Sequence, residues 1–255
     1  MMKKNIVVIA LLISSFCFAQ KEKRTLVWEE NFDKAQLSET VWNYELGDGC
    51  PDLCGWGNNE RQIYTDKNHT ISDGKLSIHA RKEGTRYTST KITTKGKKEF
   101  MYGRIEARAK LAVGKGLWPA FWMLGSNIST VGWPKSGEID ILEYVGKEPQ
   151  VVFTSLHTQD SHGNTINTKK TTIPNIEEGF HVYAIEWTKD KIEFFVDDRS
   201  VYSFAPEIKN ANTWPFDQPF YIIVNLAVGG NFGGPEVDDS VFPQDFVVDY
   251  IRVFQ

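Results

Sequence analysis

Residues 136–146 read Ser-Gly-Glu-Ile-Asp-Ile-Leu-Glu-Tyr-Val-Gly, a mostly apolar run that is bounded by glycines and carries three carboxylates. β-Branched residues between glycine breaks predict a strand, in which side chains alternate between the two faces of a sheet. Glu138 and Asp140 then share one face, whereas Glu143 falls on the opposite face. A β-bulge near Ile141 and Leu142 adds one residue and returns Glu143 to the other two acids. The sequence therefore predicts three carboxylates on one surface.

The rest of the chain also favours strands. Apolar and polar residues alternate in segments 75–81, 102–110 and 181–188, and residues 191–204 have the pattern of a hairpin. Two further runs are apolar nearly throughout, as is typical of strands covered on both faces; they are residues 119–124 and 220–226. Many short strands joined by turns predict an all-β fold, either a β-sandwich or a jelly roll.

The first nineteen residues have the pattern of a signal peptide. Two lysines precede the apolar run 6–13, and small residues occupy the positions that signal peptidase reads before the end of Ala19. Acylation of Cys17 is the alternative, but Phe16 is bulky where lipoprotein sites usually carry a small residue. The apolar run is shorter than the ~20 residues of a membrane-spanning helix. We expect cleavage after Ala19 and a secreted protein, extracellular or periplasmic, without a membrane span.

Residues 20–255 contain no linker, repeat or low-complexity segment, which favours a single domain. This part has 27 basic and 33 acidic residues, and its formal charge of −6 argues against a nucleic-acid partner. Its two cysteines, Cys50 and Cys54, predict a disulfide that closes a short loop in an exported protein. A zinc site is the weaker alternative, because the nearest histidine, His69, has no second ligand at a zinc spacing.

Glu138 and Glu143 have the residue types that glycosidic bond hydrolysis needs, one carboxyl protonated and the other ionised. Asp140 lies between them, and like charges this close separate the pKa values, so that one glutamic acid stays protonated near neutral pH. The alternative is a calcium site, but the 12-residue calcium loop with its central glycine is missing. We therefore favour catalysis over metal binding at these acids.

Tryptophans gather before and around the three acids. The chain has eight, and four of them are Trp56, Trp118, Trp122 and Trp133. Aromatic faces stack on sugar rings, whereas a single tryptophan belongs to a core about as often as to a cleft. Their clustering near the acids favours a cleft.

Three polar residues are weaker candidates. His157 ends the strand that follows the acids and can reach them, because consecutive strands commonly pair. Taken alone, a histidine is more often a structural hydrogen-bonding residue. Asn58 and Asn59 can bind sugar hydroxyls or form a turn, and the sequence by itself favours the turn.

Eight segments between about Leu26 and Phe254 form a specific pattern: Gly57–Glu60, Tyr102–Arg108, Gly116–Trp122, Gly132–Pro134, Gly137–Glu143, Phe216–Phe220, Asn225–Asn231 and Val248–Val253. With this pattern the chain resembles glycoside hydrolase family 16, in particular its bacterial laminarinase-like endo-β-1,3-glucanases. The resemblance implies a jelly-roll β-sandwich of two curved antiparallel sheets, with a substrate cleft across the concave face. It also implies a retaining double-displacement mechanism, which requires carboxyls about 5–5.5 Å apart.

The resemblance also implies residue roles. Glu138 matches the nucleophile, Glu143 the acid/base and Asp140 the carboxylate that tunes the pair. Lys91 stands where relatives usually have Arg, which keeps the charge but not the planar fork of donors. Further positions at which the family contacts sugar are occupied by Asn58, Trp118, Trp122, Trp133 and His157.

A structural calcium on the convex side is a further implication, whereas no cofactor is implied for the chemistry. Its ligands would be the backbone carbonyls of Glu30 and Gly74 and the side chain of Asp249. Asn31 replaces the Glu that is usual in the first of these segments, and it lies beside the ligand position, not on it.

The expected function is that of an exported, monomeric endo-β-1,3-glucanase that acts on laminarin-like polymers, with mixed-linkage β-glucan as a further candidate substrate. The residue inserted before Glu143 argues against the strict mixed-linkage lichenases, whose motif lacks it. Agarases and carrageenases share the longer motif and are the nearest alternatives. A non-catalytic glucan-binding protein of the same fold is the alternative of another class, and transglycosylation in place of hydrolysis stays open.

Overall fold

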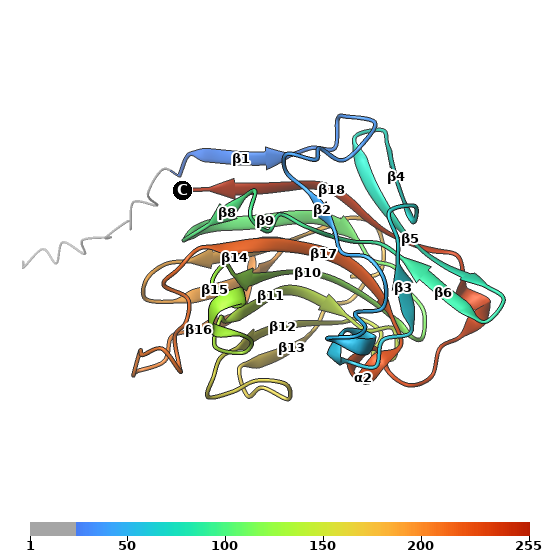
Figure 1. Cartoon of the computed structure of the whole chain (residues 1–255). Coiled ribbons are helices and arrows are strands. Elements are labelled where there is room, and N and C mark those ends of the chain that lie inside the picture. The colour runs from blue at the N-terminus through green and yellow to red at the C-terminus, as the bar shows by residue number, and fades with distance from the viewer. Residues whose placement is uncertain (1–23) are drawn as a thin grey trace, which may run out of the picture.

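The structure is a computed structural model that describes residues 24–255, in which two β-sheets pack face to face (Figure 1). The predicted all-β sandwich is therefore confirmed. The predicted signal peptide, with Cys17, lies outside the described residues. Within residues 24–255, no helix is long and apolar enough to cross a membrane.

The first sheet has ten strands, and all its pairings are antiparallel except the one between β3 and β6. Its main path runs through β16 (Arg199–Phe204), β15 (Ile192–Val196), β14 (His181–Trp187), β9 (Gly103–Lys110), β18 (Gln244–Phe254), β5 (Lys75–Glu83), β6 (Arg86–Ser89) and β3 (Gln62–Tyr64). Two more strands pair with this path, β1 (Leu26–Glu30) with β18 and β4 (His69–Ser72) with β5. The predicted hairpin is confirmed as β15 and β16.

The second sheet has eight antiparallel strands. Its order is β13 (Thr168–Thr172), β12 (Val151–His157), β11 (Glu138–Tyr144), β10 (Leu117–Gly125), β17 (Phe220–Val228), β7 (Lys91–Thr93) and β2 (Asn43–Tyr44), with β8 (Glu99–Phe100) paired to β17. The two apolar runs of the sequence form the central strands β10 and β17, as expected of strands covered on both faces.

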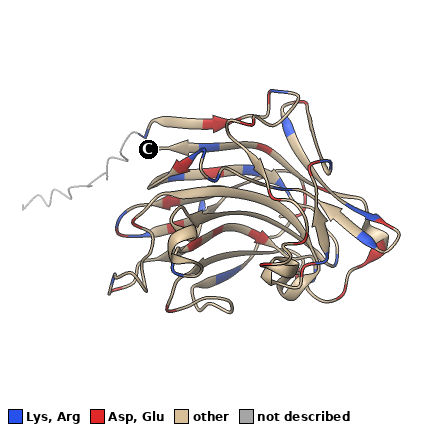
Figure 2. Cartoon of the chain, in the orientation of Figure 1, with Lys and Arg blue, Asp and Glu red and all other residues tan. Residues whose placement is uncertain are grey.

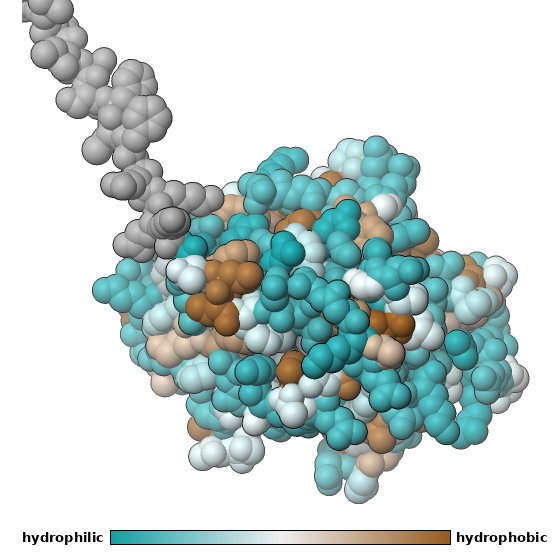
Figure 3. Space-filling view, turned by 90° about the horizontal axis from the view of Figure 1, so that it is seen from above, coloured by the Kyte–Doolittle hydropathy of each residue, from teal (hydrophilic) through white to brown (hydrophobic). Residues whose placement is uncertain are grey.

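Short helical turns complete the fold. They are η1 (Cys54–Gly57), α1 (Ile128–Val131), α2 (Gly230–Gly233) and η2 (Asp239–Val241). Seen from above the orientation of Figure 1, the molecule is mostly hydrophilic with smaller hydrophobic spots, as is usual for a face in contact with water (Figure 3).

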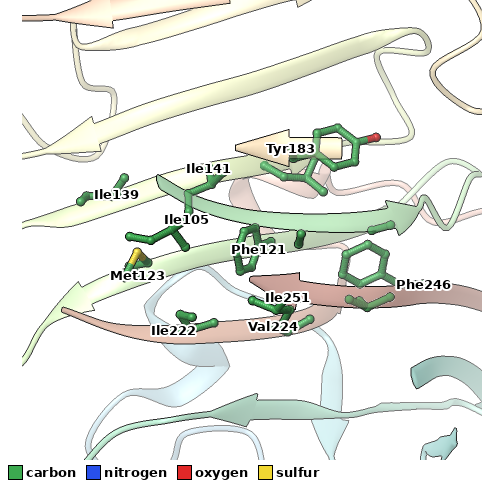
Figure 4. Packing of buried hydrophobic residues seen from close by; sticks show 14 of the residues in the cluster. Ile105, Phe121, Met123, Ile139, Ile141, Tyr183, Ile222, Val224, Phe246 and Ile251 are labelled. Atoms are coloured by element: carbon green, nitrogen blue, oxygen red, sulfur yellow. The ribbon is translucent and has the colours of Figure 1, made fainter. Parts of the chain in front are cut away.

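The core fills the space between the sheets (Figure 4). From the eight-stranded sheet it takes Phe121, Met123, Ile139, Ile141, Ile222 and Val224. From the ten-stranded sheet it takes Ile105, Tyr183, Phe246 and Ile251. Full burial of such a side chain stabilises the fold by about 1.5–3 kcal/mol, so this layer fixes which face of each strand points inward.

Strand β11 contains the predicted bulge. On β12, Asp140 lies opposite Ser155 and Glu143 opposite Phe153, so that three steps on β11 match two on its partner. Ile141 and Leu142 are consecutive, yet both belong to the core between the sheets. The alternation of side chains therefore shifts by one residue, and Glu143 returns to the open face of the sheet.

Candidate active site

The three acids of β11 lie in the middle of the eight-stranded sheet. Figure 2 shows them on a strand whose neighbours β10 and β12 carry no Lys, Arg, Asp or Glu. Glu138 and Asp140 precede the bulge and Glu143 follows it, and all three point away from the apolar layer between the sheets. A carboxylate at such a position needs a polar partner, because burial without one is costly.

His157 reaches the acids from the neighbouring strand, as strand pairing led us to expect. It lies directly opposite Glu138 in the pairing of β11 with β12. Its Nε2 atom is 3.2 Å from Asp140 Oδ2 and 3.7 Å from Glu138 Oε1. The imidazole therefore closes a compact group of three ionisable side chains.

Burial raises the pKa of two of the three acids, Glu143 and Asp140. It raises the pKa of Glu143 well above its ordinary value, and the charge of Asp140 raises it further. Burial also raises the pKa of Asp140, with the charge of Glu138 as the next cause. The charge of His157 and a hydrogen bond from Trp118 act on the Glu143 pKa in the opposite direction. The environment thus favours a protonated Glu143, the state that a general acid needs.

Two of the predicted tryptophans hold the two glutamates. Trp118 Nε1 donates a 3.1 Å hydrogen bond to Glu143 Oε1, and Trp133 Nε1 donates a 2.8 Å bond to Glu138 Oε2. Trp118 is only 8% exposed and packs edge-on against Phe232, which leaves little of its ring for a sugar. Trp133 is 46% exposed, and its ring lies against His157 and His162 beside Glu138.

Lys91 and Trp122 lie in one group on the same sheet. Lys91 Nζ is 4.2 Å from the ring centroid of Trp56 and 5.2 Å from that of Trp122. It also forms a 2.7 Å ion pair with Glu45, a residue that the sequence did not indicate. The lysine is therefore fixed between two indoles by cation–π contacts and one carboxylate.

A chain of hydrogen bonds that the sequence did not predict fixes Trp122. Its Nε1 atom donates to Asn225 Oδ1 (2.7 Å), and Asn225 Nδ2 donates to the hydroxyl of Tyr64 (2.9 Å). Tyr64 donates in turn to Glu60 Oε2 (3.3 Å), and burial raises the pKa of Glu60. Glu60 and Asn225 belong to two of the eight matching segments, and this membership was the one signal that could have identified them.

Asn58 lies in a loop that is fastened to the turn after β17. Its side chain donates to Glu60 Oε1 (3.4 Å), and its carbonyl accepts a bond from Asn231 N (2.6 Å). A Cβ on Gly230, which has φ +84°, would lie 2.9 Å from the Asn58 carbonyl oxygen. Glycine is therefore needed there, and the loop that carries the disulfide between Cys50 and Cys54 packs closely on this turn.

Comparisons with known proteins identify the family. The family model described as glycosyl hydrolases family 16 matches residues 57–251. The chain belongs to this family. The structure superposes on a laminarinase from Flavobacterium sp. UMI-01 with 70% sequence identity and a TM-score of 0.89, over 91% of this chain and all of that one.

Two curated relatives from other organisms support the same family assignment. A β-glucanase from Rhodothermus marinus is 43% identical over 90% of this chain and 85% of its own length. A glucan endo-1,3-β-glucosidase from Cryptopygus antarcticus is 38% identical over 94% of this chain and 96% of its own length. The family 16 resemblance and the jelly-roll fold are thus confirmed, and the protein is a glycoside hydrolase.

The calcium site implied for this family 16 member involves Glu30, Gly74 and Asp249. Glu30 ends β1, Gly74 lies in the turn before β5, and Asp249 lies in β18. These elements are neighbours in the ten-stranded sheet, since β1 and β5 both pair with β18. Carbonyl and carboxylate oxygens are the ligands that calcium prefers, so the donors fit the ion in kind. Asp249, however, forms an ion pair with Arg108. Calcium would have to compete with this arginine for the one carboxylate of the set.

Proposed function

We propose that this protein hydrolyses β-1,3-glucosidic bonds within laminarin-like glucans, with mixed-linkage β-1,3-1,4-glucan as a second substrate. The observation that carries the proposal is the bulge in β11, which puts two glutamates on one open face while burial favours protonation of Glu143. The β-1,3-glucan specificity is supported by the similar laminarinase and by the relatives named for this activity.

In the proposed mechanism, Glu138 attacks the anomeric carbon of the sugar and forms a glycosyl ester. Glu143 gives its proton to the departing glycosidic oxygen. The ionised Glu143 then removes a proton from water, which attacks the same carbon and releases Glu138. Two inversions at one carbon retain the β configuration. Trp133 donates to Glu138 Oε2 and thereby leaves Oε1 free for the attack.

Aromatic groups on both sides of the acids would bind the glucan. The exposed indole of Trp133 lies next to Glu138, and Lys91 contacts Trp56 and Trp122 on the other flank of the acids. Sugar rings stack on indole faces, while Lys91 and Asn58 can bind hydroxyls. Endo-action follows if the polymer lies across the face and does not enter by one end.

Export as a monomer is also part of the proposal. The signal peptide pattern of residues 1–19 supports export, and the mostly hydrophilic face in Figure 3 is compatible with a monomer. A calcium at Glu30, Gly74 and Asp249 would serve stability, since these residues lie on the ten-stranded sheet and the three acids on the other.

Product profiling on laminarin, lichenan, agarose and carrageenan tests the substrate class. We expect laminarin to give a series of short oligosaccharides from the start of the reaction, as internal cleavage does. Inactivity on laminarin combined with cleavage of agarose would overturn the proposal. Binding of laminarin without hydrolysis of any of the four polymers would favour the non-catalytic alternative.

The variant Glu138→Ser tests the mechanism. Hydrolysis should be abolished, whereas binding of laminarin oligosaccharides, measured by calorimetry, should be largely kept. Proton NMR of the wild-type reaction should show the β-anomer first, because the mechanism retains configuration. Unchanged activity in Glu138→Ser would remove Glu138 from its role.

A further inference from the structure

Three ligand atoms of different side chains converge at the open face of β11. Glu138 Oε1, Asp140 Oδ2 and His157 Nε2 all lie within 4.8 Å of one another. We propose that they form a binding site for Zn²⁺, and that the bound ion excludes the glucan and inhibits the enzyme. The inhibition rests on the proposed function, whereas the binding of the ion does not.

The spacing of these atoms suits a tetrahedral ion. Zinc binds imidazole nitrogen and carboxylate oxygen at about 2.0–2.2 Å, which puts neighbouring ligand atoms about 3.3–3.6 Å apart in a tetrahedron. His157 Nε2 is 3.2 Å from Asp140 Oδ2 and 3.7 Å from Glu138 Oε1. Small shifts of the Glu138 side chain complete the geometry. Three protein ligands leave the fourth position open, as at zinc sites that bind water or a substrate.

Asp140 gives a second indication of a cation-binding site. Its side chain is buried, with 3% of the residue exposed, and its Oδ2 atom accepts no hydrogen bond. A buried polar atom without a partner costs free energy, and this one points at His157 Nε2. A cation between the two atoms would provide the partner. Binding of the ion displaces any proton from the ligand atoms, as at other zinc sites.

Trp133 orients the third ligand. It donates a 2.8 Å hydrogen bond to Glu138 Oε2, so that Oε1 faces His157. Groups that hold a ligand in this way raise metal affinity. The donor set of one imidazole and two carboxylates favours Zn²⁺ over Ca²⁺, because calcium takes six to eight oxygen ligands. An ion on Glu138 Oε1 also occupies the oxygen that the proposed mechanism uses for attack.

Calorimetric titration of the purified protein with ZnCl₂ at pH 7, in a buffer that does not chelate metals, tests the site. We expect one Zn²⁺ per chain, with binding weakened at least tenfold in His157→Gln and in the nearly isosteric Asp140→Asn. Ca²⁺ should not displace the ion. Absence of binding, or binding that neither variant weakens, would overturn the proposal.

Two control variants test whether Zn²⁺ binds at these three ligands and not at another acid or histidine. Glu143→Gln removes an acid of the same face but none of the three ligands, and it should bind Zn²⁺ like the wild type. His181→Gln removes a histidine that pairs with Asp197 at 2.6 Å in another part of the molecule, and it should also bind normally. Loss of Zn²⁺ binding in His181→Gln would place the ion elsewhere and overturn the proposal.

Competition with the glucan separates this inference from the proposed function. Laminarin oligosaccharides added to Glu143→Gln should weaken the binding of Zn²⁺, and Zn²⁺ should inhibit wild-type hydrolysis competitively and reversibly with a chelator. A protein that binds Zn²⁺ through His157 but does not hydrolyse laminarin would overturn the function alone. Active enzyme that is unaffected by saturating Zn²⁺ would overturn the inhibition.

Discussion

Trp118 Nε1 donates a 3.1 Å hydrogen bond to Glu143 Oε1 across the paired strands β10 and β11. Burial raises the pKa of Glu143, and this hydrogen bond acts in the opposite direction. Trp133 makes the corresponding bond to Glu138. Each glutamate of the proposed pair is thus held by one indole, and the two indoles differ mainly in exposure.

Trp118→Phe should raise the pKa of Glu143 further, because the donor that favours the ionised form is lost. The alkaline limb of the pH profile of kcat/KM should move to higher pH. A hydrogen bond to a charged group contributes about 1.5–3 kcal/mol, so kcat should fall about tenfold or more. Trp122→Phe is the control, since Trp122 donates to Asn225 and not to an acid. An unmoved limb in Trp118→Phe would contradict this prediction.

Glu143→Gln should lower kcat on laminarin by about 10²–10⁴-fold, as expected for loss of general acid–base catalysis. Formation of the glycosyl ester from an activated aryl glycoside needs no acid and should be lowered far less. Stopped-flow release of the aryl group measures this step. The exposed Glu207→Gln serves as the control. An equal loss on both substrates would show that Glu143 does not protonate the leaving group.

Glu60→Gln should change how stability depends on pH. Burial raises the pKa of Glu60 in the folded protein, so the folded state holds this proton more tightly than the unfolded chain. The stabilisation is complete below the unfolded pKa and is lost as pH rises through the folded pKa. Relative to wild type, the variant should therefore gain melting temperature from acidic to neutral pH. Parallel melting curves would contradict the raised pKa.

Tyr64→Phe should weaken both the fold and the binding of substrate. The change leaves Asn225 Nδ2 without its acceptor and should cost about 1–3 kcal/mol of unfolding free energy. Because Asn225, the hydrogen-bond partner of Trp122, is then no longer held by Tyr64, KM should rise more than kcat falls. Urea unfolding and steady-state kinetics measure the two effects. The control is Tyr202→Phe in the ten-stranded sheet, which should leave KM unchanged.

Calcium bound at Glu30, Gly74 and Asp249 should raise the melting temperature. After treatment with EDTA, added Ca²⁺ should stabilise the protein increasingly with concentration, because a ligand bound only to the folded state shifts the equilibrium. Asp249→Asn should remove this gain and keep the activity. A melting temperature that does not respond to Ca²⁺ would show that Arg108 is the partner of Asp249 in solution.

The order of residues alone was sufficient to predict the β-strands and the face of the strand on which each acid lies. The pleat of a strand has a period of two, so Glu138 and Asp140 had to share a face and Glu143 could join them only through a bulge. The core supplied the driving force, since Ile141 and Leu142 are both buried between the sheets. The doubly apolar runs likewise indicated the central strands β10 and β17.

Contacts between distant segments were decided only by the tertiary structure. Sequence could not show that Asn225 joins Trp122 to Tyr64, that Lys91 lies between two indoles, or that Asp140 Oδ2 has no hydrogen-bond partner. Periodicity fixes the side of a strand on which a residue lies, because that depends on local backbone geometry. Which strands become neighbours, and how closely their side chains approach, depends on the packing of the whole core. The sequence therefore determined the fold and the acids of the candidate site, and the packing determined the partners that hold them.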